Sequence, residues 1–397
     1  QSVSAKDRIV AMLIALFAPK SILFHMVGAE QKTEDDIATI IFSSGSEGIP
    51  KGVVLSHRNI MVVVESVREM FPHDKRSCLV GFLPFFHSFG YSVSLWTGLL
   101  EGLLTVFHPN PLEPKPIGQL IKKYGGSIMI ATPTFLQGFI RRCTPEQLAS
   151  LDCVITGAEK LPERIQTAFN DRFSIEPMEG YGTTECAPVV SVNIPNIESP
   201  GFYMEYSRQG TIGRPFPHQV VKIVDPDSHD ELPVGEAGLL MVKGPNIMVG
   251  YLNDPEKTAE VLQDGWYATG DIATVDEDGF ITITDRLARF SKIGGEMIPH
   301  NHIEERLHTL IDLTEQTLIV AGIPDESRGE CLVVLHTLDD TQLATLKERL
   351  KKSDLPNIWR PRPNSFYRID AIPLLGTGKM DIKKAKQMAL ELAGNKK

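Results

Sequence analysis

Residues 42–52, "FSSGSEGIPKG", combine the hydroxyl groups, glycines and lysine from which anion-binding loops are built. The phosphate-binding loop of nucleoside triphosphatases needs glycine before its lysine and Ser or Thr after it. Pro50 and Gly52 occupy those positions here. Because proline has no N–H for a phosphate and glycine no hydroxyl for a metal, the sequence excludes that loop type. Such a stretch is more often an ordinary turn. The groups that could still hold an anion are Ser43, Ser44, Gly45, Ser46, Gly48 and Lys51.

Further loops follow predicted strands and end in small or polar residues. In an open α/β sheet, ligands bind beyond the carboxyl ends of the strands, so we expect such loops to converge on one site. The loops are 82–90, 155–161, 179–188, 265–273, 283–298 and 372–381.

The elements that must position these loops change in character along the chain. From about residue 36 to 190, short apolar strands alternate with amphipathic helices, which predicts a layered α/β domain with a largely parallel sheet. The predicted strands are 38–42, 77–84, 102–109, 126–133 and 151–158, and the predicted helices are 56–71, 116–125 and 161–173, with further helices at 300–311 and 340–352. From about 200 to 285, short strands separated by Gly, Pro and Asp turns predict a small β-barrel or distorted sheet. The remaining residues predict a separate α+β lobe. We therefore expect domains at 1–190 (an N-terminally incomplete α/β unit), 191–285 and 286–397.

Composition narrows the class of protein. The chain has 397 residues, 42% hydrophobic and 23% charged, with a net charge of −10 and a pI near 5.6. This acidity gives no general attraction to nucleic acid, so we expect no nucleic-acid partner. Five scattered cysteines form neither a zinc spacing nor a CxxC pair, which favours a reducing, cytoplasmic compartment.

The N-terminal stretch 7–28, "DRIVAMLIALFAPKSILFHMVG", is apolar but interrupted by Pro19 and Lys20. It falls short of the roughly 20 uninterrupted apolar residues that a membrane span needs. A buried helix is the favoured interpretation, and a helix on a membrane surface is the alternative. The first residue is Gln1, so we interpret the chain as a piece of a longer protein.

Taken in order, these motifs resemble those of the adenylate-forming superfamily, which includes acyl-CoA synthetases, luciferases and the adenylation domains of peptide synthetases. The resemblance spans residues 40–380. It implies that a carboxylate attacks the α-phosphate of ATP, releasing pyrophosphate, and that a thiol then takes the acyl group. The loop at 42–52 would hold the β- and γ-phosphates, with Mg²⁺ bridging phosphate oxygens.

The resemblance also implies a role for each matched residue. Glu185 would bind the metal, Thr184 would meet the α-phosphate, and Tyr181 would pack on adenine within a loop that includes Gly180, Gly182 and Thr183. The turn at Gly157, Ala158 and Glu159 would pass beside adenine, and Asp271 and Arg286 would bind ribose. Lys379 would stabilise the transition state of adenylation, His87 would close the acyl site, and Gly295 would line the thiol tunnel.

Two stretches, "SSGSEGIPKG" at 43–52 with its Glu47 and "RFSKIGGEMIPH" at 289–300, resemble the acyl-ACP synthetase part of bifunctional 2-acylglycerophosphoethanolamine acyltransferase/acyl-ACP synthetases. They imply a fatty acid substrate, acyl carrier protein as acceptor in lysophospholipid re-acylation, and a fused acyltransferase domain that brings the enzyme to the inner face of the cell membrane. Coenzyme A as the acceptor and a nucleotide-binding fragment without turnover remain alternatives. The resemblance also implies that the C-terminal lobe rotates between the two half-reactions, presenting the loop with Lys379 in the first and the loop with Gly295 in the second. The sequence departs from the family at Ala288, where the hinge residue is often Asp or Lys, and at Glu47, which replaces a common threonine. A docking face for the acidic carrier could be formed by Arg286, Arg289, Lys292, Lys351, Lys352, Arg360 and Arg362, although such groups of charges are more often simply solvated.

Overall fold

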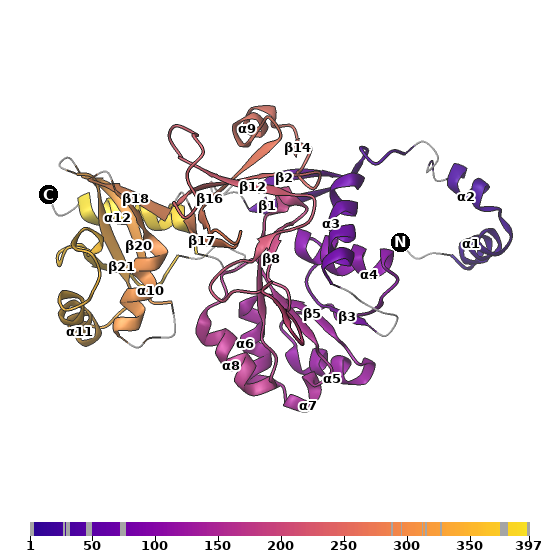
Figure 1. Ribbon diagram of the computed structural model, residues 1–397, viewed down its shortest axis with the longest axis horizontal. Coiled ribbons are helices and arrows are strands. Elements are labelled where there is room, and N and C mark those ends of the chain that lie inside the picture. The colour runs from indigo at the N-terminus through magenta and orange to yellow at the C-terminus, as the bar shows by residue number, and fades with distance from the viewer. Residues whose placement is uncertain are drawn as a thin grey trace.

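The computed structural model describes residues 4–394 except 27, 29–31, 45–49, 72–76, 287–288, 295, 312, 314–315, 326–327 and 374–379. Figure 1 shows an elongated arrangement, with a central body, a lobe at the C-terminal end and two helices at the N-terminal end. We call residues 32–286 the large lobe and residues 289–394 the small lobe.

A seven-stranded sheet in the order β11-β8-β7-β6-β5-β3-β4 forms one layer of the large lobe. Strands β3 to β7 are parallel, whereas β8 and β11 run antiparallel, so the predicted largely parallel sheet is confirmed. The strands are β3 (Cys78–Gly81), β4 (Leu104–Phe107), β5 (Ile128–Ala131), β6 (Cys153–Thr156), β7 (Met178–Gly182), β8 (Val189–Val192) and β11 (Arg214–Pro215).

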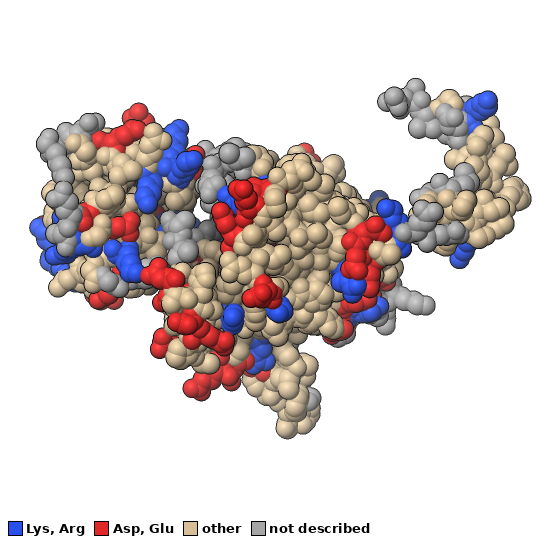
Figure 2. All heavy atoms as spheres, turned by 90° about the horizontal axis from the view of Figure 1, so that it is seen from above, with Lys and Arg blue, Asp and Glu red and all other residues tan. Residues whose placement is uncertain are grey.

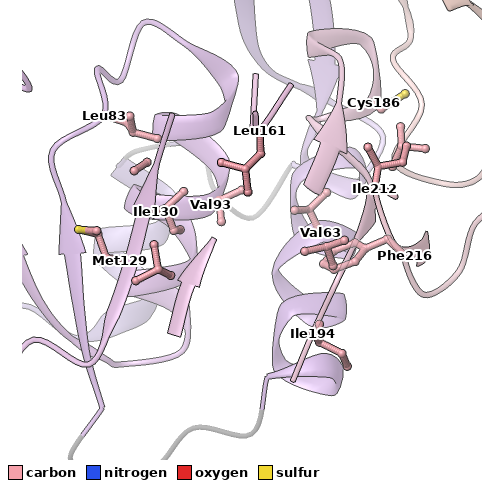
Figure 3. Packing of buried hydrophobic residues seen from close by; sticks show 14 of the residues in the cluster. Val63, Leu83, Val93, Met129, Ile130, Leu161, Cys186, Ile194, Ile212 and Phe216 are labelled. Carbon is pink, nitrogen blue, oxygen red and sulfur yellow. The ribbon is translucent and has the colours of Figure 1, made fainter. Parts of the chain in front are cut away.

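Helices pack around this sheet (Figure 1). The predicted helices at 116–125 and 161–173 are confirmed as α5 and α8, and each presents apolar residues to the core. Figure 3 shows how side chains from well-separated segments, such as Val63, Met129 and Phe216, contribute to that core. The helices are α3 (His57–Met70), η2 (Phe89–Trp96), α4 (Thr97–Leu100), α5 (Pro114–Tyr124), α6 (Pro133–Arg142), α7 (Pro145–Leu148), α8 (Glu163–Phe173) and η3 (Thr184–Cys186).

The glycine-rich loop lies between two strands. β1 (Ile37–Ser44) pairs antiparallel with β2 (Pro50–Ser56), and β14 (Gly250–Tyr251) pairs with β2. The sequence predicted the strand before the loop and helix α3 after it, and both are confirmed. It did not predict β2, because its apolar run is only Val53–Leu55, which the structure buries as a strand.

The β-rich region forms a five-stranded sheet in the order β12-β13-β16-β15, with β17 also paired to β16. A small distorted sheet was predicted here and is confirmed. The elements are β12 (Val220–Val224), β13 (Gly238–Lys243), β15 (Leu262–Gln263), β16 (Trp266–Val275), β17 (Ile281–Arg286), helix α9 (Pro255–Val261) and the separate hairpin β9 (Ile197–Ser199) and β10 (Phe202–Met204).

The small lobe has a sheet in the order β19-β18-β21-β20, with β22 parallel to β21. Its buried residues form two clusters distinct from that of the large lobe, one with Leu318 and Leu346 and one with Ile319 and Ala389. The elements are β18 (Phe290–Ile293), β19 (Glu296–Pro299), α10 (His300–Leu310), β20 (Leu318–Asp325), β21 (Gly329–His336), α11 (Asp340–Lys351), η5 (Asn357–Trp359), β22 (Phe366–Arg368) and α12 (Ile382–Gly394).

The apolar N-terminal stretch forms α1 (Ala5–Phe17) and α2 (Lys20–Met26), which stand apart from the body in Figure 1. The expectation of burial is wrong for the described residues. Leu16 is 67% exposed and Phe17 77%, because no described element packs on them closely enough to cover them. In the described part of the chain, no helix combines the length and the apolar character needed to cross a membrane.

Candidate active site

Tyr181 and Asp271 join the two main sheets of the large lobe. Tyr181 lies on β7 and Asp271 on β16, and the tyrosine hydroxyl donates a hydrogen bond to the carboxylate. Asp271 is only 3% exposed. Burial and the neighbouring carboxylate raise the pKa of Tyr181 well above its usual value, so the hydroxyl remains a donor. Arg286 is paired opposite Asp271 in the β16–β17 ladder, although its side chain lies outside the described residues.

Glu185 lies in the loop 179–188, which we call the acidic loop, and joins it to β14 and the residues just before that strand. The Tyr251 hydroxyl donates to Glu185 Oε1 at 2.9 Å, and the amide of Met248 donates to the Glu185 carbonyl at 2.8 Å. Lys51 lies on β2 opposite Ser43, with its Nζ 5.1 Å from the centre of the Tyr251 ring. Tyr251 therefore connects the predicted metal ligand to the predicted phosphate-binding lysine.

Thr184 connects the same loop to the segment that carries His87. The hydroxyls of Ser88 and Thr184 are 3.2 Å apart and share a hydrogen bond. His87 is exposed, and its Nδ1 accepts a bond from the Phe89 amide at 3.3 Å. The ring of Phe89 lies beside Gly157, where an added Cβ would be 3.3 Å from that ring and from the Gly180 carbonyl.

The turn after β6 contains a left-handed residue and is bonded to the start of α6. Ala158 has a left-handed φ of 68°, which is uncommon for a residue with a Cβ. Glu159 is exposed and accepts a hydrogen bond from the Thr134 hydroxyl at 2.6 Å. The turn thus lies beside the site, with Gly157 facing inward and Glu159 bonded to the start of α6.

Two buried asparagines hold these loops together. Asn59 Nδ2 donates to the carbonyls of Pro245 and Ile247, both at 2.8 Å, and ties the start of α3 to the segment before β14. Asn246 Nδ2 donates to the Cys186 carbonyl at 2.8 Å and ties that segment to η3. Asn59 also completes a capping box with Ser56, which fixes where α3 begins.

Gly182 shows how closely the acidic loop packs. A Cβ at this position would lie 1.9 Å from the Pro188 carbonyl oxygen, so only glycine fits. The loop therefore turns back sharply on itself, and Thr183 bonds within it to the Cys186 sulfur at 3.4 Å.

Several predicted site residues lie outside the described residues. They are the side chain of Ser44 and all of Gly45, Ser46, Glu47, Gly48, Ala288, Gly295 and Lys379. The structure therefore brings together Ser43, Lys51, His87, Gly157, the loop 180–185 and Asp271, and leaves the lysine and thiol-tunnel loops as predictions.

The prediction that Arg289 belongs to a docking face is wrong. Arg289 is 4% exposed, and its Nη2 donates to the Glu304 carboxylate at 2.6 Å. A guanidinium enclosed in the small lobe cannot contribute to a docking face. Lys292 is exposed but pairs with Asp227 at 2.7 Å.

Sequence reasoning missed Tyr251 and Ser88, which connect the loops of the site. Tyr251 stands in no motif that marks it as functional, and Ser88 lies in the predicted loop 82–90 but was not singled out there. Glu185 is 66 positions from Tyr251, and Thr184 is 96 positions from Ser88, so only the folded chain shows these contacts.

Comparison with known proteins gives a consistent result. The family described as AMP-binding enzyme matches residues 6–252. The long-chain-fatty-acid–CoA ligase of Bacillus subtilis is 32% identical over 321 residues, covering 79% of this chain and 55% of that protein. The 4-coumarate–CoA ligase-like 4 of Oryza sativa is 32% identical over 306 residues, covering 76% and 54%. The chain thus spans about half the length of these curated relatives.

Solved structures share the fold. ATP-bound MatB from Rhodopseudomonas palustris matches with a TM-score of 0.76 and 24% identity, covering 91% of this chain and 70% of that one. The o-succinylbenzoate CoA synthetase of Bacillus subtilis, in complex with its acyl-adenylate intermediate, matches with a TM-score of 0.76 and 24% identity, covering 89% and 70%. With the motifs, the gathered loops and the family match in agreement, the chain belongs to the AMP-binding enzyme family.

Proposed function

We propose that this chain carries the catalytic machinery of an AMP-forming acid–thiol ligase that acts on a fatty acid. The observation that supports this most strongly is an unbroken series of contacts among the predicted site loops. It runs from Lys51 through Tyr251 to Glu185 and, along the same loop, through Thr184 to Ser88. Tyr181 and Asp271 extend it towards a ribose site.

In the first half-reaction, a fatty acid carboxylate oxygen attacks the α-phosphorus of ATP and pyrophosphate leaves. In the second, a thiol sulfur attacks the acyl carbon, the bond to AMP breaks and the thiol proton is released. The protein's task is to hold charges in place rather than to form covalent bonds. Asp271 would accept the ribose hydroxyls, Thr184 would donate to the α-phosphate, and Lys379 would reach between the carboxylate and that phosphate in the first step.

Glu185 fits a magnesium ion that arrives with the nucleotide. It supplies a hard oxygen ligand whose orientation is set by the Tyr251 hydroxyl. Among the described residues no group of three or more His, Cys, Asp or Glu side chains could hold a metal by itself. Mg²⁺ typically takes one or two carboxylates and completes its shell with phosphate oxygens and water. The ion would neutralise phosphate charge during the first step.

Pyrophosphate release with ATP, Mg²⁺ and a long-chain fatty acid tests the activity. We expect fatty-acid-dependent release from the wild-type chain and loss of release in Asp271→Ala. A chain that binds ATP but releases no pyrophosphate would instead support the alternative of a nucleotide-binding fragment without turnover. The chain's coverage of about half its relatives' length keeps that alternative in view.

For the acceptor we propose acyl carrier protein, which is acidic. A hollow of about 310 Å³ in the small lobe is lined by Leu350, Phe366 and two prolines together with four basic residues. The basic residues are Lys347, Lys351, Arg360 and Arg362. Figure 2 shows Lys and Arg side chains gathered in patches on the small lobe, on a protein whose net charge is −10. An acidic amphipathic helix matches such a surface in both charge and polarity.

The charge-reversal pair Lys351→Glu and Arg362→Glu tests this docking surface. We expect it to weaken binding of acyl carrier protein at least tenfold in fluorescence anisotropy. The matched control, Lys122→Glu with Arg141→Glu, makes the same charge change on exposed residues of the large lobe and should have little effect. Equal weakening by both pairs would contradict a specific site. Offering carrier protein and coenzyme A to the acyl-adenylate and weighing the products decides between the two acceptors.

We also propose that α1 and α2 contact the inner face of the membrane, in keeping with a fused acyltransferase domain. The exposed apolar residues include Leu13, Leu16, Phe17 and Phe24. Flotation with vesicles of phosphatidylethanolamine and phosphatidylglycerol should carry the chain upward. Leu16→Ser with Phe17→Ser should abolish this, and retained flotation would overturn the proposal.

A further inference from the structure

The junction between the two lobes contains buried polar groups that the proposed site does not use. β17 of the large lobe ends at Arg286, and the small lobe begins at Arg289. On either side of this connection lie side chains that are nearly inaccessible to solvent. They are Asp285, Arg289, His300 and Glu304, each at most 4% exposed.

Asp285 contacts the small lobe through α10, the first helix of that lobe. Asn301 donates to Asp285 from its backbone amide at 2.7 Å and from its side-chain Nδ2 at 2.5 Å. Asn301 lies in the first turn of α10, where backbone amides have no partner within the helix and a negative charge is favoured. The carboxylate at the end of β17 therefore satisfies the start of a helix in the other lobe.

Arg289 has its main partner inside the small lobe. Its Nη2 donates to Glu304 Oε1 at 2.6 Å, and the same oxygen accepts from the Val320 amide at 2.6 Å. Its Nε is buried without a hydrogen-bond partner among the described residues and lies 3.9 Å from Asp285 Oδ1. Arg289 thus moves with α10, and its link to Asp285 is long.

The connection between the lobes is therefore anchored to α10 at both ends. Asp285 precedes it and bonds to Asn301, whereas Arg289 follows it and bonds to Glu304. If the small lobe turns about this connection, Arg289 and Glu304 turn together and keep their bond. The Asp285–Asn301 bonds join the two lobes, so they must break.

Two exposed ion pairs on the surface between the lobes are weaker. Lys292 pairs with Asp227 at 2.7 Å, and Lys160 with Glu305 at 2.9 Å. Each of these four side chains is more than half exposed, so solvent and salt screen both pairs. Buried hydrogen bonds to a charged acceptor contribute more. Phe290 adds an apolar contact to Val224, Leu239 and Ile272.

We propose that Asp285 is the positioning residue that holds the small lobe in the observed orientation and releases it when the lobe turns. The inference rests on the proposed function in one respect, namely that the small lobe presents different loops in the two half-reactions. Asp285 and Arg289 supply polar contacts on either side of the connection, where the predicted hinge residue is Ala288, which has no polar group. The equilibrium between orientations then depends on one buried carboxylate.

Pulsed electron paramagnetic resonance tests this without requiring turnover. Spin labels at Glu146→Cys and Glu348→Cys, both exposed, report the distance between the lobes in a Cys331→Ser background. We expect one main distance in the parent protein. In Asp285→Ala the population at that distance should fall relative to others by about tenfold, because a buried charged hydrogen bond is lost. Asp227→Ala is the matched control, since it removes a carboxylate from an exposed pair and should leave the main distance dominant.

Asn301→Ala is a milder second variant in case Asp285→Ala does not fold. It removes the bond from the Asn301 side chain to Asp285 and keeps the bond from the Asn301 backbone amide. It should shift the same population in the same direction by a smaller factor. An unchanged distance distribution in both variants, with unchanged melting temperatures, would overturn the proposal. In the active protein, Asp285→Ala should change the ratio of the two half-reaction rates by about tenfold, whereas a merely structural role would lower both together. If no turnover is found at all, the proposed function fails while the distance measurement still tests Asp285.

Discussion

The predicted nucleotide-binding loops of the large lobe and the attachment of the small lobe are held in different ways. In the large lobe, Tyr181–Asp271 and Tyr251–Glu185 join segments far apart in sequence, and Asn59 and Asn246 fix the surrounding backbone. The small lobe has its own cores and is attached through Asp285, one phenylalanine contact and exposed ion pairs. This difference is what the proposed turning of the small lobe requires, because few buried contacts would have to break. The predictions below test that difference.

Lys379→Ala should have the largest effect. Adenylation should fall by about 10²- to 10³-fold, because a charge that stabilises the transition state is removed. Thioester formation from supplied acyl-adenylate should be retained, since the lysine serves only one orientation. Stopped-flow measurement of each half-reaction checks this, with Lys384→Ala on α12 as the control. Normal adenylation in Lys379→Ala would remove the lysine from the mechanism.

Tyr181→Phe should impair both half-reactions, in contrast to Lys379→Ala. The change leaves the buried Asp271 carboxylate without the tyrosine hydrogen bond, which costs about 1–3 kcal/mol. Denaturant unfolding measures that loss, and calorimetric titration with AMP measures the accompanying loss of affinity. Tyr203→Phe, on the exposed hairpin β9–β10, is the control. Unchanged stability and affinity would show that the hydrogen bond does not organise the site.

Glu179→Gln should change the pH dependence of the large lobe. Burial raises the pKa of Glu179 to about 7, against an opposing hydrogen bond from the Leu161 amide. Because this pKa is raised, the folded state binds the Glu179 proton more tightly than the unfolded state does. The resulting contribution of Glu179 to stability is present at low pH and is lost as the pH rises from about 4.5 through 7. The glutamine variant should therefore be more stable than the wild type at pH 8 by about 1–2 kcal/mol, and similar to it at pH 4.5. Unfolding at both pH values provides the comparison; an identical difference at both would refute the assignment.

Exchanging the charges of the Lys160–Glu305 pair should have the smallest effect. Lys160→Glu alone places two carboxylates together and should favour other lobe orientations by about 0.2–1 kcal/mol. Adding Glu305→Lys should restore the original distribution, and 0.5 M salt should remove the effect of either change. Spin-label distances measure this. An effect larger than that of Asp285→Ala would reverse the order of the contacts proposed here.

Much of the fold was accessible from local pattern. The strands β3 to β6 and the helices α3, α5, α8, α10 and α11 were predicted because each carries a continuous apolar period with recognisable ends. β2 was missed because three apolar residues after a lysine and a glycine do not form a strand pattern by themselves. Burial of the N-terminal helices was wrong because apolar character requires a partner surface to become burial, and no described element covers Leu16 or Phe17.

The candidate site divides in the same way, between features that the local sequence predicts and contacts that only the folded chain shows. Its residue types and their order are local properties, so the sequence by itself, through its resemblance to the family, predicted which side chains could bind phosphate, metal and ribose. The partners of those side chains are not local. Tyr181 lies 90 positions from Asp271, and Asn59 lies 188 positions from Ile247. Only the tertiary structure decided that Arg289 is enclosed, that Tyr251 bonds to Glu185 and that Asp285 bonds to Asn301 of the small lobe, because contacts between distant segments depend on how the sheets and helices pack.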